Sequence, residues 1–119
     1  MSVNIAQVVI DCSDAQKLAG FWSAVLDRPV GDGANQFVAT LPGGPGETSL
    51  MLLAVPEGKQ SKNRLHLDLG LSEGSDWQKE LERILALGAT QVSEHREYGI
   101  HWVCLQDPEG NEFDLAVGH

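Results

Sequence analysis

Apolar and polar positions along the first half of the chain change period in a regular order. The mostly apolar segment Asn4 to Cys12 predicts a strand, and apolar residues at helical spacing from Ala15 to Leu26 predict a helix that Ser13 or Asp14 can cap. Glycines and an asparagine between residues 31 and 35 predict the start of a hairpin. Its second arm and the following strand are predicted over Gln36 to Leu41 and Thr48 to Val55.

The second half repeats this order of elements. Ser75 or Asp76 can cap a helix that runs through Leu87, where apolar residues again recur at helical spacing and Gly88 follows. Alternation of apolar and polar residues predicts strands over Arg64 to Leu69, Gln91 to Glu97, Ile100 to Gln106 and Asn111 to Val117. Each half is therefore predicted to be a strand, a helix and three strands.

Matching positions in the two halves are separated by nearly the same number of residues. Gln7 and His66 are 59 positions apart, and Leu53 and Asp114 are 61 apart. This repetition predicts two similar modules, about residues 1–58 and about residues 62–119, within one domain over residues 1–119.

Composition limits the classes of function. The chain has 119 residues, 42% of them apolar, which suffices for one compact core, and its formal charge of −9 disfavours nucleic acid and anionic membrane surfaces as partners. No apolar run approaches the ~20 residues of a membrane-spanning helix, so the expectation is a soluble cytoplasmic protein. Cys12 and Cys104 lie in apolar strand patterns without metal-type spacing and are expected to be reduced, buried thiols.

Two polar residues stand inside apolar strand patterns in the second half. Period-two geometry directs His66 and Asp114 at a sheet face. A lone histidine in such a strand is more often a hydrogen-bonded core or cleft residue than a metal ligand. A carboxylate on an inward face needs a partner, which could be a metal ion, an arginine, a tyrosine or water.

Several nearby residues are open to two interpretations. Asp107 and Glu109 belong to an Asp-Pro-Glu-Gly sequence that is typical of a turn, so a structural role is favoured for both. Glu112 shares the strand face of Asp114 and could be a catalytic base or a rim charge. His95 and His101 are expected at the surface or at the rim of a cavity.

Whether an apolar side chain can line a cavity depends on the face of the sheet on which it lies. Trp102 lies near the hairpin of the second half and is a candidate for a cavity wall. Phe37, Met51 and Leu53 are the candidates from the first half. With Trp102 they form the predicted substrate-binding set.

The ordered set of motifs resembles the vicinal oxygen chelate superfamily, which contains glyoxalase I, bleomycin-resistance proteins and extradiol dioxygenases. The resemblance spans nearly the whole chain and is closest to the compact glyoxalase-like domains. It is carried by a Ser-Asp helix start followed by Phe21-Trp22, by Asn63-Arg-Leu-His-Leu-Asp68, and by Trp102 leading to Asp107-Pro-Glu-Gly-Asn-Glu-Phe113.

The resemblance implies an α+β fold of two tandem βαβββ modules whose curved mixed sheets surround a shared cavity. Its metal ligands come from the first and last strands of each module, which selects Gln7, Leu53, His66 and Asp114. Imidazole, carboxylate and amide donors suit zinc, nickel, iron(II) or manganese, but Leu53 has no donor atom. The implied metal site, made of Gln7, His66 and Asp114, is therefore incomplete.

Three functions follow from the resemblance. The favoured one is a small-molecule cavity protein of the glyoxalase or bleomycin-resistance type with an incomplete or atypical metal site. The first alternative is a divalent-metal-dependent lyase, isomerase or dioxygenase, in which Glu112 would assist proton transfer. The second is a dimeric interaction module without ligand chemistry. The family also implies a homodimer.

Overall fold

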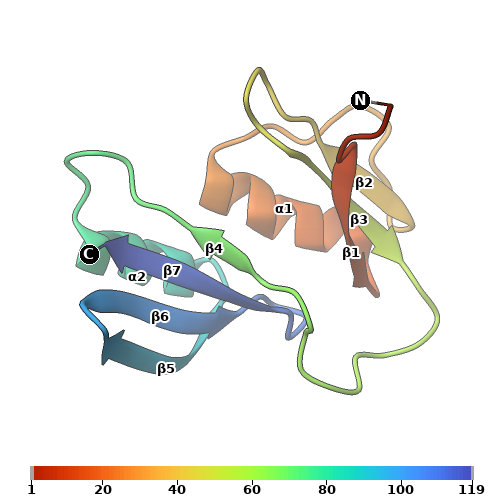
Figure 1. Ribbon diagram of the computed structural model, residues 1–119. Helices are drawn as coiled ribbons and strands as arrows, with labels where there is room; N and C mark the ends of the chain where they lie inside the picture. The colour runs from red at the N-terminus through yellow and green to blue at the C-terminus, as the bar shows by residue number, and fades with distance from the viewer. Residues whose placement is uncertain (1, 119) are drawn as a thin grey trace. The chain divides into compact units, whose positions relative to one another are not determined.

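The computed structural model describes residues 2–118 (Figure 1). The chain falls into two compact units that divide between Gly58 and Lys59. Each unit contains one helix and one mixed sheet, so the predicted α+β class and the two curved mixed sheets are confirmed. The single domain and the cavity shared by the modules stay predictions. In the described part of the chain, no helix has both the length and the apolar character to cross a membrane.

The first unit is a three-stranded sheet with one helix. Its elements are β1 (Gln7–Cys12), α1 (Ala15–Leu26), β2 (Val38–Leu41) and β3 (Ser49–Ala54). The strand order is β1-β3-β2, with β1 parallel and β2 antiparallel to the central β3. The parallel pairing of β1 with β3 is possible because α1 and β2 make the long connection between them.

Helix α1 has the bounds that its apolar spacing predicts. The Asp14 carboxylate accepts a hydrogen bond from the backbone N–H of Lys17 at 3.2 Å and so caps the first turn. At the other end Asp27 takes a left-handed conformation with φ of 51°, which ends the helix. The buried side of the helix carries Ala15, Leu18, Ala19, Phe21, Trp22 and Val25.

The first unit lacks one predicted strand. Two strands follow α1 where three were expected, so this module is βαββ and the prediction of βαβββ is wrong here. The backbone of Gly31 still donates to Thr40 and that of Asn35 to Val38, but these bonds are isolated. Gly33 has a φ of 84°, and the Asn35 side chain binds the N–H groups of Phe37 and Val38, which bends the chain into a turn.

The second unit has the complete predicted order. It contains β4 (Leu67–Leu69), α2 (Trp77–Ala86), β5 (Thr90–Glu97), β6 (Ile100–Gln106) and β7 (Glu112–Gly118). The strand order is β4-β7-β6-β5, with β4 parallel to β7 and the other pairs antiparallel. Strand β4 is shorter than predicted, since it begins after His66. In both units, therefore, the first strand lies beside the last strand.

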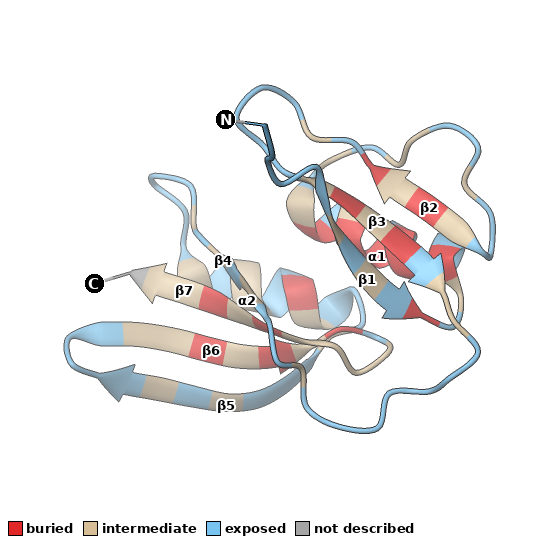
Figure 2. Ribbon diagram, turned by 45° about the vertical axis from the view of Figure 1, so that its right-hand side comes forward, coloured by how far each residue is buried: buried red, intermediate tan, exposed pale blue. Residues whose placement is uncertain are grey.

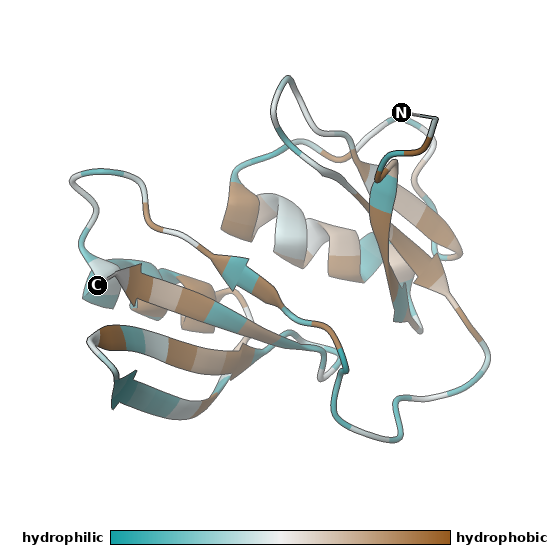
Figure 3. Cartoon of the chain, viewed as in Figure 1, coloured by the Kyte–Doolittle hydropathy of each residue, from teal (hydrophilic) through white to brown (hydrophobic). Residues whose placement is uncertain are grey.

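Alternation along the strands separates two faces of the second sheet. Val103, Leu105, Phe113 and Leu115 are at most 2% exposed. They lie on the face of α2, as the edge-to-face contact between Trp77 of α2 and His101 of β6 shows. The buried and less buried positions alternate along β6 and β7 (Figure 2), and hydropathy alternates in the same way along β7 (Figure 3). The second face is left for polar groups.

The turn between β6 and β7 is built around Asp107, which is 3% exposed. Its carboxylate accepts hydrogen bonds from the N–H groups of Glu109 at 2.9 Å and Asn111 at 3.0 Å, and from the Asn111 side chain at 3.0 Å. Gly110 has a φ of 86°, a conformation that glycine adopts without strain. The predicted structural role of Asp107 is confirmed.

Replacing Asp107 by Ala is expected to destabilise the protein by about 2–4 kcal/mol, because it leaves two backbone donors and the Asn111 side chain of this turn without their acceptor. Urea unfolding followed by circular dichroism measures the change. Glu73→Ala, in an exposed loop, is the control and should change the free energy of unfolding by less than about 0.5 kcal/mol. Equal stability of the two variants would contradict the role of Asp107.

Candidate metal centre

The face of the second sheet that is turned away from α2 collects most of its polar side chains. The strand register places Asp68 opposite Asp114, Asp114 opposite Cys104, and Cys104 opposite Ser93. One row of polar residues therefore crosses all four strands. We call this side of the sheet the ligand face; it carries His66, Asp68, Ser93, His95, Trp102, Cys104, Gln106, Glu112, Asp114 and Ala116.

Three of these residues converge on one point. The Nε2 atom of His66 lies 3.1 Å from Oδ1 of Asp68 and 3.2 Å from Oδ2 of Asp114. One donor atom from each of the three lies within 4.8 Å of the others. Side-chain exposure is 47% for His66, 64% for Asp68 and 16% for Asp114, so the cluster is open to solvent on the His66 and Asp68 side.

The geometry of this cluster fits a divalent cation. A single imidazole N–H can direct its hydrogen along only one line, so Nε2 cannot make two well-aligned hydrogen bonds to two carboxylates. Ligand atoms about 2.1 Å from a common ion at roughly 100° to each other lie about 3.2 Å apart, which matches the distance from Nε2 of His66 to each of the two carboxylate oxygens. One imidazole and two carboxylates suit zinc, nickel, iron(II) or manganese.

Sequence reasoning selected His66 and Asp114 but missed Asp68. The signal was present in His66-Leu67-Asp68, because residues two apart on a strand share one face. What alternation could not supply was the register of β4 on β7, which puts Asp68 directly beside Asp114.

Gln7 belongs to the first unit and has a different neighbour. Its Nε2 atom lies 3.9 Å from the sulfur of Met51. Gln7 and His66 are matching positions, so Val9 and Asp68, two residues farther on, match as well. Val9 pairs with Met51, and Asp68 pairs with Asp114. By this register Met51, and not Leu53, holds the position in the first unit that corresponds to Asp114. Leu53 is 38% exposed and lies on the same sheet face as Met51. The metal role of Gln7 stays a prediction.

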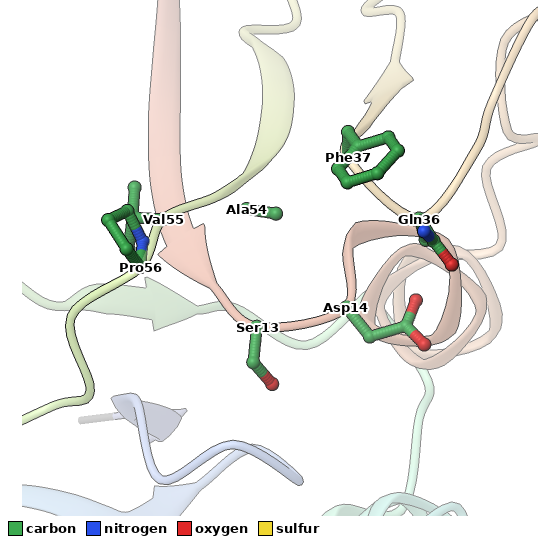
Figure 4. Close-up of a pocket in the computed structure, with 7 residues that line it drawn as sticks. All are labelled: Ser13, Asp14, Gln36, Phe37, Ala54, Val55 and Pro56. Atoms are coloured by element: carbon green, nitrogen blue, oxygen red, sulfur yellow. The ribbon is translucent and has the colours of Figure 1, made fainter.

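Phe37 lines a depression of about 510 Å³ in the first unit (Figure 4). The side chain is 64% exposed and lies opposite Ser13 and Asp14, where β1 passes into α1. The remaining lining residues are Gln36, Ala54, Val55 and Pro56. Met51 and Leu53 are not among the residues that line this depression. Their binding role, with that of Trp102 in the second unit, stays a prediction.

Glu112 is held by the segment that leads into β4. Its Oε1 atom accepts a hydrogen bond from the N–H of Asn63 at 2.6 Å and lies 3.0 Å from Nζ of Lys59. Burial alone would raise the pKa of Glu112, but the Asn63 hydrogen bond and the Lys59 ammonium outweigh it and lower that pKa below the ordinary value. A carboxylate held ionised in this way fastens residues 59–63 to β7 and is a weak base.

Cys104 lies between Ser93 and Asp114 in the polar row. Burial raises the pKa of its thiol, and the Asp114 carboxylate raises it further, against the opposing effect of a hydrogen bond with Ser93. The thiol is therefore protonated near neutral pH and is a poor metal ligand there. Cys12 and Cys104 form no disulfide with each other; Cys12 is buried, as predicted, whereas Cys104 is only partly buried.

The two histidines of the β5–β6 hairpin lie on opposite faces of the sheet. His101 contacts Trp77 and lies 2.7 Å from Glu94, and its side chain is 14% exposed, so it is largely covered on the face of α2. The other expected position, at the rim of a cavity, stays a prediction. His95 stacks on Trp102 on the ligand face. A register shift between Gln91 and Ser93 of β5 brings Ser93 and His95 opposite Cys104 and Trp102.

Comparison with known proteins identifies the family. The profile of the glyoxalase-like domain matches residues 7–116, and the chain therefore belongs to the glyoxalase-like domain family. No curated protein sequence matches the chain. The resemblance inferred from the sequence motifs is confirmed.

Solved structures share the fold at low identity. A glyoxalase/bleomycin resistance protein/dioxygenase family enzyme from Burkholderia phytofirmans is 17% identical with a TM-score of 0.79, over 96% of this chain and 98% of that one. A fosfomycin resistance protein, FosX, from Listeria monocytogenes, solved with Mn(II) and a dihydroxypropylphosphonic acid, is 15% identical with a TM-score of 0.77, over 100% and 93%. A lactoylglutathione lyase from Agrobacterium tumefaciens is 16% identical with a TM-score of 0.69, over 99% and 95%.

Replacing Glu112 by Gln is expected to destabilise the protein at pH 7 by about 1–3 kcal/mol, since hydrogen bonds to the charged oxygen are lost or weakened. The folded-state pKa lies below the ordinary value of 4.5. The carboxylate therefore stabilises the fold fully above about pH 4.5 and loses this contribution as pH falls through the folded-state pKa.

Urea unfolding at pH 7 and at pH 3 measures this effect. The difference between wild type and Glu112→Gln should be present at pH 7 and shrink at pH 3. Glu73→Gln, which changes an exposed carboxylate, is the control. A difference that does not depend on pH would show that Glu112 acts through packing and not through its charge.

Proposed function

We propose that this protein binds a divalent metal ion through His66, Asp68 and Asp114 and uses it to hold a small organic ligand. The observation that carries the proposal is the approach of one imidazole nitrogen to two carboxylate oxygens at 3.1 and 3.2 Å. The proposed centre is atypical for the family, since all three ligands come from the second module. Mn(II) in the FosX structure supports a divalent ion in a protein of this fold.

The three protein ligands leave coordination positions open for a substrate. A bound divalent ion would act as a Lewis acid and attract oxygen atoms of the ligand. Exposure of His66 and Asp68 gives a ligand access to this side of the cluster. Asp114 is the anchor of the centre, because it is the least exposed of the three and is fixed in the central region of the sheet.

The ion pair and the lowered pKa of Glu112 favour binding over catalysis. The predicted base is tied to Lys59 and Asn63, and its lowered pKa makes it a poor proton acceptor. The alternative, a metal-dependent lyase or dioxygenase, draws support from the fold of the lactoylglutathione lyase. That alternative requires a different group to move the proton.

Untagged wild-type protein is expected to bind one zinc, nickel, iron(II) or manganese ion per chain. His66→Ala and Asp68→Asn should each weaken the affinity by more than about tenfold, because each removes a ligand or its charge. Calorimetric titration with elemental analysis of the dialysed protein measures both quantities.

Asp11→Asn is the matched control, because Asp11 is an exposed carboxylate of β1 outside the cluster. Its metal affinity should equal that of the wild type. A wild-type protein that binds none of the four ions, or a His66→Ala variant that binds as well as the wild type, would refute the metal centre.

The proposal extends to a homodimer. Val3 and Ile5 are 86% and 81% exposed, and they precede β1, which is an edge strand of its sheet. Exposed apolar residues beside an unpaired strand edge favour association with a second chain.

Light scattering at about 0.1 mM protein should give twice the 12.9 kDa mass of one chain. A double change of Val3 and Ile5 to Ser is expected to shift the mass toward the monomer, because it removes apolar contacts. Val92→Ser, at an exposed apolar residue of β5, is the control. A monomeric wild type at this concentration would contradict the dimer.

A further inference from the structure

We propose that the first unit carries a second binding site, for a small organic cation, in the depression of about 510 Å³ that Phe37 lines (Figure 4). The ligand is a primary ammonium group on an aromatic or apolar body. This inference does not depend on the proposed metal centre, because every residue that lines the depression belongs to the first unit.

The depression lies at the carboxyl ends of the two parallel strands of the first sheet. Strand β1 ends at Cys12 and β3 ends at Ala54, and α1 begins just after β1. In sheets whose parallel strands are joined through a helix, ligands bind in crevices outside the carboxyl ends of the strands. The depression therefore occupies a position that is suited to a ligand.

Phe37 lies on the face of this sheet that α1 covers. It is two residues before Ala39, which is 2% exposed, and residues two apart on a strand share one face. Strands β2 and β3 both pack against α1. The first residue of α1, Ala15, is bonded to Gln36, so Phe37 lies at the end of the helix, where its side chain is 64% exposed. The opposite face of the sheet, which carries Met51, is not involved.

Backbone hydrogen bonds tie the three segments that line the depression to one another. The N–H of Ala15 donates to the carbonyl of Gln36 at 2.9 Å, and the N–H of Ala54 donates to the carbonyl of Phe37 at 2.8 Å. A third bond, of 2.9 Å, joins the residue after β3 to the end of β1. Because its walls are already fixed, the site loses little conformational entropy when a ligand binds.

The walls of the depression suit a cation with an apolar body. Phe37 and Pro56 contribute apolar rings, and the Asp14 carboxylate and the Gln36 amide contribute polar atoms (Figure 4). The face of an aromatic ring attracts a cation, and a carboxylate attracts the same cation. The Asp14 carboxylate also caps α1, which holds it in place.

The charge of the first unit favours a cation over an anion. Residues 1–58 contain six acidic residues and two basic ones, Lys17 and Arg28, so their net charge is −4. Arg28 donates to the carbonyl of Thr48 at 2.8 Å and lies 3.8 Å from Glu47, and neither of these residues lines the depression. The positive end of the α1 dipole is equivalent to only about half a charge, which the Asp14 carboxylate outweighs.

Three indole compounds of almost the same size test the site. Tryptamine carries an ammonium group, tryptophol a hydroxyl group and indole-3-acetate a carboxylate. Metal-free wild type should bind tryptamine with a Kd of about 2 mM or tighter, as is typical of about twelve non-hydrogen atoms. It should bind tryptophol at least about threefold more weakly and indole-3-acetate most weakly. NMR titration of the backbone amides measures each Kd, with the shifts expected at Ser13, Asp14 and Phe37.

Two variants remove the two attractive groups one at a time. Asp14→Asn removes the charge and keeps the helix cap, because asparagine caps a helix as well as aspartate does. Phe37→Leu removes the aromatic ring and leaves an apolar side chain. Each should weaken tryptamine binding by about twofold to fivefold. Asp32→Asn is the matched control, because Asp32 is an exposed carboxylate of the same unit that does not line the depression.

The outcomes separate this site from general attraction to an acidic protein. Wild type that shows no preference for tryptamine over tryptophol would overturn the proposal. Unchanged tryptamine affinity in Asp14→Asn or in Phe37→Leu would overturn it, as would an equal loss in Asp32→Asn or amide shifts confined to residues 59–118. A wild type that binds no metal but prefers tryptamine would refute the metal centre and leave the cation site standing.

Discussion

The parallel pairing of β4 with β7 is the constraint on which the candidate site depends. It sets Asp68 beside Asp114 and brings His66, which precedes β4, within 3.2 Å of Asp114. Asp114 is more than 40 positions from His66 and Asp68 in the chain, so no local preference can bring it to them. Because β4 has only three residues, the site depends on a short edge strand that Glu112 helps to hold through Asn63 and Lys59. Stability at that edge and ligand binding are therefore coupled.

Much of the fold could be predicted from the period of the sequence. The helix over Ala15 to Leu26 and the strand, helix and three strands of the second half follow from strong periodic patterns with capping residues at their ends. The segment between α1 and β2 could not be predicted in this way. Its glycines and Asn35 are equally suited to a hairpin or to an irregular turn, and the Asn35 side chain decides by binding two backbone N–H groups.

The candidate site was predicted in part for a similar reason. Alternation gives the face of each residue, and so it selected His66 and Asp114. It does not give the register between strands, which is decided by pairing over long distances. Asp68 was missed on that account, and Leu53 was matched to Asp114 where the register matches Met51. The hydrogen bond and the ion pair of Glu112 could not be predicted either, because its partners Asn63 and Lys59 lie 49 and more positions away in the chain.

Strand β5 contains one residue that has no partner in the ladder with β6. Ladder pairing is regular on both sides of residue 92, with Gln91 opposite Leu105 and Ser93 opposite Cys104. Loss of the single residue between them would leave both flanks in place. The ladder that places the imidazole of His95 against the indole of Trp102 therefore does not depend on the side chain at position 92.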